Sequence, residues 1–290
     1  KPRYIGPGLS PGTDVFGRRY RDVAYGSGVY AECVSKPLAE FTSIKEIEER
    51  YIWPDPDWWD VSGIEKQLRG HEDYPVQAGH YEPFLIYKDL RGDEQAFLDL
   101  LINPEMVHYC LDKMMDLDYT LIQRMYESLP GRITLTYVAE DMGGQEDLLI
   151  SPGHIHEFLI PRMKKIIDLV HQAGGFVFHH TDGASRKIIP DMIDAGIDLL
   201  NPIQWRCPGM EREELKRDFG DKIVFHGAVD NQYTLPFGSV EEVRREVRDN
   251  IRILGFDGKY ILAPCHNIQA VSPPENIVAM YETGYSAGRL

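Results

Sequence analysis

The chain has 290 residues, a formal net charge of −15 at pH 7 and a hydrophobic fraction of 43%, so it is long enough to bury one large core. The acidic balance argues against a nucleic-acid surface, which needs a basic patch, and no long uncharged apolar run predicts a membrane span. The four cysteines are far apart and include no C-x-x-C pair, so they predict neither a disulfide framework nor a zinc ribbon. We expect reduced thiols and a cytoplasmic protein.

The first part of the chain, residues 1–70, differs in composition from the rest. It is rich in Gly, Pro, Arg and Tyr at its start and shows little helical periodicity. Ser43 and Glu46 have the spacing of a capping box and predict a short helix over residues 44–50. Two prolines, Pro54 and Pro56, exclude a regular helix after it. We expect residues 1–70 to be an irregular region packed on the main domain.

From Pro75 onward, short apolar runs alternate with amphipathic segments. The predicted strands cover residues 75–79, 133–138, 176–179, 197–200, 223–225 and 260–262. The predicted helices cover residues 94–101, 104–128, 152–173, 184–195, 211–219, 240–254 and 274–285. Because the connections are short, this alternation favours a parallel sheet, and the number of repeated units favours an α/β barrel.

Polar side chains follow each predicted strand, at the rim where the carboxyl ends of parallel strands share one face. In chain order they are His80, Tyr81, Glu140, Asp141, Gln145, His180, Asp182, Asn201, Gln204, His226, Asp230, Cys265 and His266. Imidazole, carboxylate and thiol groups together are what a metal site or a proton-transfer site needs, so this set indicates an enzyme. A phosphate cofactor is not indicated, because no Gly-rich phosphate loop, nucleophile elbow or H-E-x-x-H pattern occurs.

Several motifs taken together resemble the uroporphyrinogen decarboxylase superfamily. They are His180-Thr181-Asp182-Gly183, residues 189–198 with Leu200-Asn201-Pro202, residues 215–220, Leu235-Pro236-Phe237-Gly238 and Pro273-Pro274-Glu275-Asn276-Ile277. The resemblance implies a single (β/α)₈ TIM-type barrel domain over residues 1–290, with its site at the rim described above. A complete barrel of this superfamily has more chain before the position of Lys1, which leaves open an N-terminally incomplete barrel.

The superfamily holds metal-free decarboxylases of tetrapyrroles and corrinoid-linked methyltransferases, which bind zinc through a His-x-Cys pair and a distant Cys. We do not find the Arg-rich loop of the decarboxylases in this sequence. In the methyltransferase pattern His180 takes the His position and Asp182 the first Cys position. The third ligand is then either His266 or Cys265. The resemblance thus implies a metal site with harder ligands, for which zinc is the first expectation and iron or another divalent ion the alternative.

A metal with nitrogen and oxygen ligands is a better Lewis acid toward a neutral oxygen than a thiolate-rich one. We therefore predict an O-demethylating methyltransferase that moves a methyl group from a small methoxy donor to a corrinoid carried by a partner protein. Glu140, Asp141 or His226 would supply the proton that the leaving oxygen needs. The predicted substrate-binding residues are His80, Tyr81, Gln145, Asn201, Gln204 and Asp230.

Two alternatives of other classes stay open. One is a metal-free decarboxylase of a tetrapyrrole or a smaller acid, and the other is a non-catalytic barrel that binds a tetrapyrrole or corrinoid. His180 and Asp182 could also form no more than a hydrogen-bonded turn, since Asp is common before Gly. A homodimer is expected only by analogy with the decarboxylases.

Overall fold

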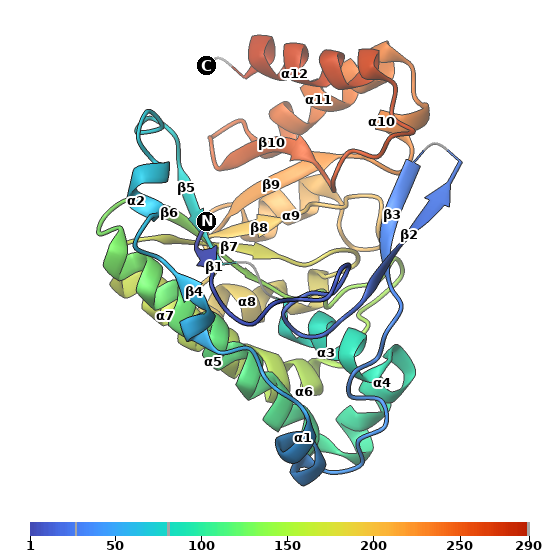
Figure 1. Ribbon diagram of the computed structural model, residues 1–290. Coiled ribbons are helices and arrows are strands. Elements are labelled where there is room, and N and C mark those ends of the chain that lie inside the picture. The colour runs from blue at the N-terminus through green and yellow to red at the C-terminus, as the bar shows by residue number, and fades with distance from the viewer. Residues whose placement is uncertain (27, 80–81, 289–290) are drawn as a thin grey trace. The chain divides into compact units, whose positions relative to one another are not determined.

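The computed structural model describes residues 1–26, 28–79 and 82–288 of the chain (Figure 1). These residues form two compact units. The first unit comprises Lys1–Val23, Tyr30–Glu140 and Gly153–Val177, and the second comprises Ala24–Val29, Asp141–Pro152 and Phe178–Leu290. No helix of the described residues is both long enough and apolar enough to cross a membrane.

The first unit is mainly helical and contains two parallel strands, β5 (Val76–Ala78) and β6 (Ile133–Ala139). Its longest helix, α5 (Pro104–Ser128), begins with Pro in its first turn and buries an apolar stripe at three- and four-residue spacing. The other helices are α1 (Ile44–Arg50), η1 (Pro56–Trp58), α2 (Ile64–Gln67), α3 (Pro83–Arg91), α4 (Asp93–Ile102), α6 (Pro152–His154), η2 (Ile155–Leu159) and α7 (Ile160–Gln172).

Two small sheets belong to the N-terminal region. Strands β1 (Arg3–Tyr4) and β4 (Trp59–Asp60) pair in antiparallel fashion, and β2 (Tyr20–Tyr25) pairs with β3 (Gly28–Cys33). Helix α1 carries the predicted capping box, because Ser43 Oγ accepts from the Glu46 amide while the Glu46 side chain accepts from the Ser43 amide. The region expected to be irregular therefore contains short regular elements. The single-domain organisation of residues 1–290 stays a prediction.

The second unit contains the end of strand β7 (Phe176–His180), from Phe178 onward. In the parallel sheet β7 is followed by β8 (Leu199–Asn201), β9 (Val224–Val229) and β10 (Tyr260–Pro264). Its helices are η3 (Arg186–Ile188), α8 (Ile189–Ala195), α9 (Arg212–Phe219), α10 (Thr234–Phe237), α11 (Val240–Leu254) and α12 (Pro274–Ala287). Helices α11 and α12 pack together (Figure 1), and their buried faces meet β9 and α10 in one apolar cluster: Val229, Leu235, Val243, Val247, Ala279 and Met280.

The repeated strand–helix units confirm the predicted α/β fold of the TIM type, and three elements show the clearest differences from their predicted bounds. The helix expected over residues 152–173 contains a π turn at Ile155–Leu159, just before Pro161, which has no N–H to donate to the preceding turn. Helix α8 begins later than expected, with Pro190 in its first turn. Strand β9 is longer than predicted and runs through Gly227 and Ala228, which have φ of 106° and 70°.

Candidate metal centre

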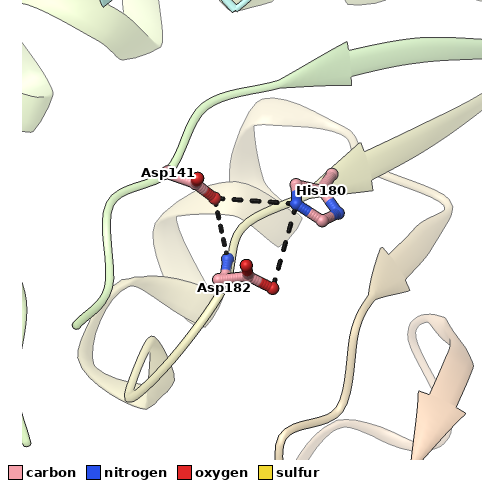
Figure 2. A group of neighbouring side chains, drawn as sticks. All are labelled: Asp141, His180 and Asp182. Atoms are coloured by element: carbon pink, nitrogen blue, oxygen red, sulfur yellow. Dashed lines mark hydrogen bonds and ion pairs between the residues drawn. The ribbon is translucent and has the colours of Figure 1, made fainter. Parts of the chain in front are cut away.

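Three side chains of the second unit that are suited to binding a metal lie together: Asp141, His180 and Asp182 (Figure 2). One ligand atom of each lies within 4.8 Å of the others. His180 Nε2 is 3.6 Å from Asp141 Oδ1 and 3.9 Å from Asp182 Oδ1. These distances are too long for hydrogen bonds, but they suit three ligands arranged around one ion.

Two loops that touch through their backbones bring these side chains together. The Asp182 amide donates to Asp141 Oδ1 at 3.1 Å, and the Ala184 amide donates to the Gly144 carbonyl at 2.7 Å. Gly183 has a φ of +80°, and a Cβ at this position would collide with the Gly144 carbonyl. Glycine is therefore required for the close approach of the two loops.

The ring orientation of His180 is set by Asn201. His180 Nδ1 lies 2.7 Å from Asn201 Oδ1. Because an amide oxygen can only accept, Nδ1 carries the ring proton and Nε2 presents its lone pair on the side of the two carboxylates. The Asn201 amide nitrogen donates in turn to His226 Nδ1 at 2.7 Å, so the proton of the neutral His226 ring resides on Nε2.

Burial is the largest influence on the pKa values of Asp182 and of the nearby His226. Burial raises the pKa of Asp182 and the nearby Asp141 carboxylate raises it further, whereas His180 and His266 lower it. Burial also lowers the pKa of His226 to about 4, with a smaller contribution from His180. His226 is therefore neutral at pH 7.

Asp182 Oδ1 is a buried acceptor without a hydrogen-bond partner among the described residues. A buried carboxylate oxygen in this state is costly, and a bound cation would compensate for it. The donor set of one imidazole nitrogen and two carboxylate oxygens suits zinc and other divalent ions. The residues present therefore fit a divalent metal.

The predicted third ligands lie outside this group. The Cys265 thiol is buried and donates to the Ile203 carbonyl at 3.2 Å. Burial raises its pKa, which disfavours the thiolate that a metal would bind. His266 is exposed, and its ring is not among the clustered ligand atoms. The third side chain of the group belongs to Asp141, which the sequence suggested as a proton donor.

Glu140 has a different environment from the one expected of a proton donor. Its buried carboxylate accepts from the amides of Phe84 at 2.7 Å and Leu85 at 3.0 Å, at the start of helix α3. A carboxylate at a helix N-terminus is stabilised in its charged form. Helix α3 was not predicted from the sequence, although Pro83 after Glu82 is a recognisable signal for the first turn of a helix.

The predicted substrate-binding residues have mixed environments. Asp230 accepts from the amides of Gln232, Tyr233 and Thr234, just before and at the start of the short helix α10. Gln204 accepts from the amide of Gly183, the residue that follows Asp182 of the candidate metal centre. Gln145 is exposed and accepts from the Gln232 side chain at 3.3 Å. His80 and Tyr81 lie outside the described residues.

A family model described as uroporphyrinogen decarboxylase (URO-D) matches residues 61–286, which is most of the chain and includes the whole Asp141–His180–Asp182 group. The chain belongs to the uroporphyrinogen decarboxylase family. This confirms the family resemblance predicted from the motifs.

Two comparisons add detail to this membership of the uroporphyrinogen decarboxylase family. A chloroplastic uroporphyrinogen decarboxylase of Zea mays is 24% identical over 218 residues, which are 66% of this chain and 52% of the maize protein. The chain therefore spans about half the length of that curated relative. A solved structure of a methyltransferase from Methanosarcina mazei matches with a TM-score of 0.70 at 18% identity, over 94% of this chain and 76% of that chain. At this identity the match shows the shared fold.

Proposed function

We propose that this member of the uroporphyrinogen decarboxylase family is a metal-dependent methyltransferase. It would move a methyl group from a small methoxy compound to a corrinoid carried by a partner protein. The observation that carries the proposal is the Asp141–His180–Asp182 group, in which a buried Asp182 oxygen has no hydrogen-bond partner among the described residues. The fold likeness to a protein named as a methyltransferase is in keeping with it.

Asp141, His180 and Asp182 would hold the ion, and zinc is the ion we favour because it accepts imidazole nitrogen together with carboxylate oxygen. When bound, the ion would act as a Lewis acid toward the methoxy oxygen of the donor. Asn201 would keep Nε2 of His180 directed at the site, since its side-chain oxygen accepts the proton on Nδ1. Gln204, which accepts from the Gly183 amide, would fix the loop that carries Asp182.

In the proposed reaction the bond between the methyl carbon and the donor oxygen breaks. The methyl group passes to cobalt(I) of the corrinoid, which supplies the electron pair of the new bond, and the oxygen takes up a proton from water. His226 is neutral and holds its ring proton on Nε2, so it would donate a hydrogen bond to the leaving oxygen. Glu140 is held by two backbone amides, and Asp141 belongs to the ligand group.

The test combines metal analysis with a methyl-transfer assay. We expect the full chain, purified without chelator, to hold about one zinc or iron per chain. His180→Ala and Asp182→Ala should lose this metal, whereas Asp194→Asn, an exposed carboxylate on α8, should retain it. With methanol or 2-methoxyphenol and cob(I)alamin, the wild type should form methylcobalamin, seen in its visible absorption. Folded protein that neither contains nor takes up metal would contradict the proposal.

A second candidate is decarboxylation, which the family model and the maize relative favour by name. This reaction releases carbon dioxide from an acid substrate and, in our hypothesis, requires no metal. Carbon dioxide release from uroporphyrinogen by metal-free protein, unaffected by His180→Ala, would support it over methyl transfer.

A further inference from the structure

The first unit contains a cavity that is separate from the candidate metal centre. This cavity of about 610 Å³ is lined by residues of α2, β5 and α5, and it shares no lining residue with the Asp141–His180–Asp182 group. Its size falls in the range of small-molecule pockets. Most of its wall is apolar and includes Val76, Ala78, Leu121, Ile122 and Leu129.

Polar residues also line the cavity, among them Lys1, Gln67 and His71, and Asp118 is the one carboxylate in the described lining. Asp118 lies on α5 three and four residues before Leu121 and Ile122, so all three side chains share one face of the helix, and all three line the cavity. Asp118 is only 4% exposed. Within the part of the chain that the structure describes, its carboxyl group makes no hydrogen bond or ion pair.

A buried carboxyl group without a partner is costly, and this helix face would be more stable with an apolar residue. Burial alone raises the pKa of Asp118 to about 8. The cost would be offset by a bound cation, because a carboxylate and an ammonium group attract each other strongly where water is excluded. The acidic protein, with its net charge of −15, also attracts cations from solution.

We propose that this cavity binds a small molecule consisting of an apolar body and one ammonium group, with Asp118 as the partner of the ammonium. The apolar walls would hold the hydrocarbon part, and Asp118 would select an amine over an alcohol or an acid of the same length. The proposal does not depend on the methyltransferase hypothesis.

The test uses the full 290-residue chain and isothermal titration calorimetry with three probes of equal chain length: n-octylamine, n-octanol and octanoate. We expect octylamine to bind at least ~10-fold more tightly than octanol, and octanoate to bind most weakly. Asp118→Asn, which keeps the side-chain shape, should reduce octylamine binding to the level of octanol. Asp116→Asn removes the same charge from an exposed position on the same helix and should bind octylamine like the wild type.

Two results would overturn the proposal. One is equal binding of octylamine and octanol by the wild type. The other is a loss of octylamine binding in Asp116→Asn as large as in Asp118→Asn, because this would indicate nonspecific attraction to an acidic protein. Asp118→Leu provides a second variant that should keep octanol binding and lose the preference for the amine. The same titrations with His180→Ala should match the wild type, which separates this cavity from the candidate metal centre.

Discussion

Asn201 lies directly opposite His180 in the parallel pairing of β7 with β8, and its side-chain oxygen is 2.7 Å from His180 Nδ1. Residues opposite each other in neighbouring strands point to the same face of the sheet. The register of the two strands therefore decides which nitrogen of His180 is available to a metal. This relationship makes Asn201 a positioning residue for the candidate metal centre.

The first prediction concerns that positioning. Asn201→Ala should weaken zinc binding by about 10- to 100-fold while leaving all three candidate ligands in place. Asn201→Asp should recover part of the affinity, because a carboxylate can still accept the proton of Nδ1. A competition titration against a zinc-binding dye measures both. Asn267→Ala, an exposed residue after β10, is the control, and equal affinities in all four proteins would contradict the prediction.

The second prediction concerns Asp182 in the metal-free protein. Burial and the neighbouring Asp141 raise its pKa, so the charged form is unfavourable in the fold. Asp182→Asn should therefore stabilise the metal-free protein at pH 7, by on the order of 1 kcal/mol or a few degrees in Tm. The same variant should fail to gain stability from added zinc. Thermal unfolding with and without EDTA gives both results, with Asp194→Asn expected to behave like the wild type. Destabilisation of the metal-free variant would show that Asp182 has a purely structural role.

The third prediction concerns the glycine contact between the two loops. Gly183→Ala should destabilise the protein by about 2 kcal/mol or more, because it adds a collision with the Gly144 carbonyl to an unfavourable positive φ. Gly174→Ala is a matched control, since Gly174 has a φ of +78° but open space around its Cβ position. Urea unfolding compares the two. Only Gly183→Ala should also weaken metal binding, and equal losses of stability would mean that the backbone conformation alone matters.

The fourth prediction concerns His226 and acid stability. Its pKa is lowered from 6.5 to about 4 in the folded protein, so the unfolded chain binds more protons between these two values. The neutral His226 ring therefore contributes fully to the free energy of unfolding above pH 6.5, and this contribution is lost as the pH falls toward 4. His226→Gln, which can still accept from Asn201, should show a weaker loss of stability between pH 7 and pH 5 than the wild type. Urea unfolding of metal-free protein at these two pH values measures the difference, and parallel losses would argue against a buried neutral ring.

The fifth prediction concerns Asp118, whose effect on the change of stability with pH is opposite in sign to that of His226. Its pKa is raised from 3.8 to about 8, so between these values the folded protein holds a proton that the unfolded chain has released. The contribution of Asp118 to stability should fall as the pH rises through this range, by up to about 1.4 kcal/mol per pH unit. Asp118→Asn should remove this slope, whereas Asp116→Asn should keep it. The same change in unfolding midpoint between pH 5 and pH 8 in the wild type and in Asp118→Asn would show that Asp118 titrates normally.

The elements that could be predicted from sequence are those with a clear local signal. Helix α5 was predicted with the bounds that the structure has, because its apolar spacing is regular and Pro104 occupies its first turn. Helix α3 was missed because the polar residues around Glu82 were interpreted as a loop after a strand. Strand β9 was predicted too short, since Gly227 and Ala228 look like the start of a loop.

The candidate metal centre could be predicted only in part, because some of its residues have no local signal in the sequence. His180 and Asp182 follow a buried strand directly, so their sequence context indicates their location. Asp141 lies about 40 residues earlier in the chain, and its contact with them depends on how two loops meet. Asn201 was predicted to bind substrate, whereas strand register directs its side chain to His180. Pairings of this kind depend on tertiary structure, which local periodicity does not encode.

The two loops of the candidate metal centre are joined at their backbones, through the Ala184 amide and the Gly144 carbonyl, at a glycine contact. The side chain of Asp182 takes no part in that junction, which uses only its neighbours and its own amide. The side chain at position 182 can therefore be replaced without removing the backbone contact between the two loops. Asp182→Cys would replace a hard candidate ligand with a soft one on the same scaffold, so this single substitution should shift the expected preference of the candidate metal centre toward softer metals.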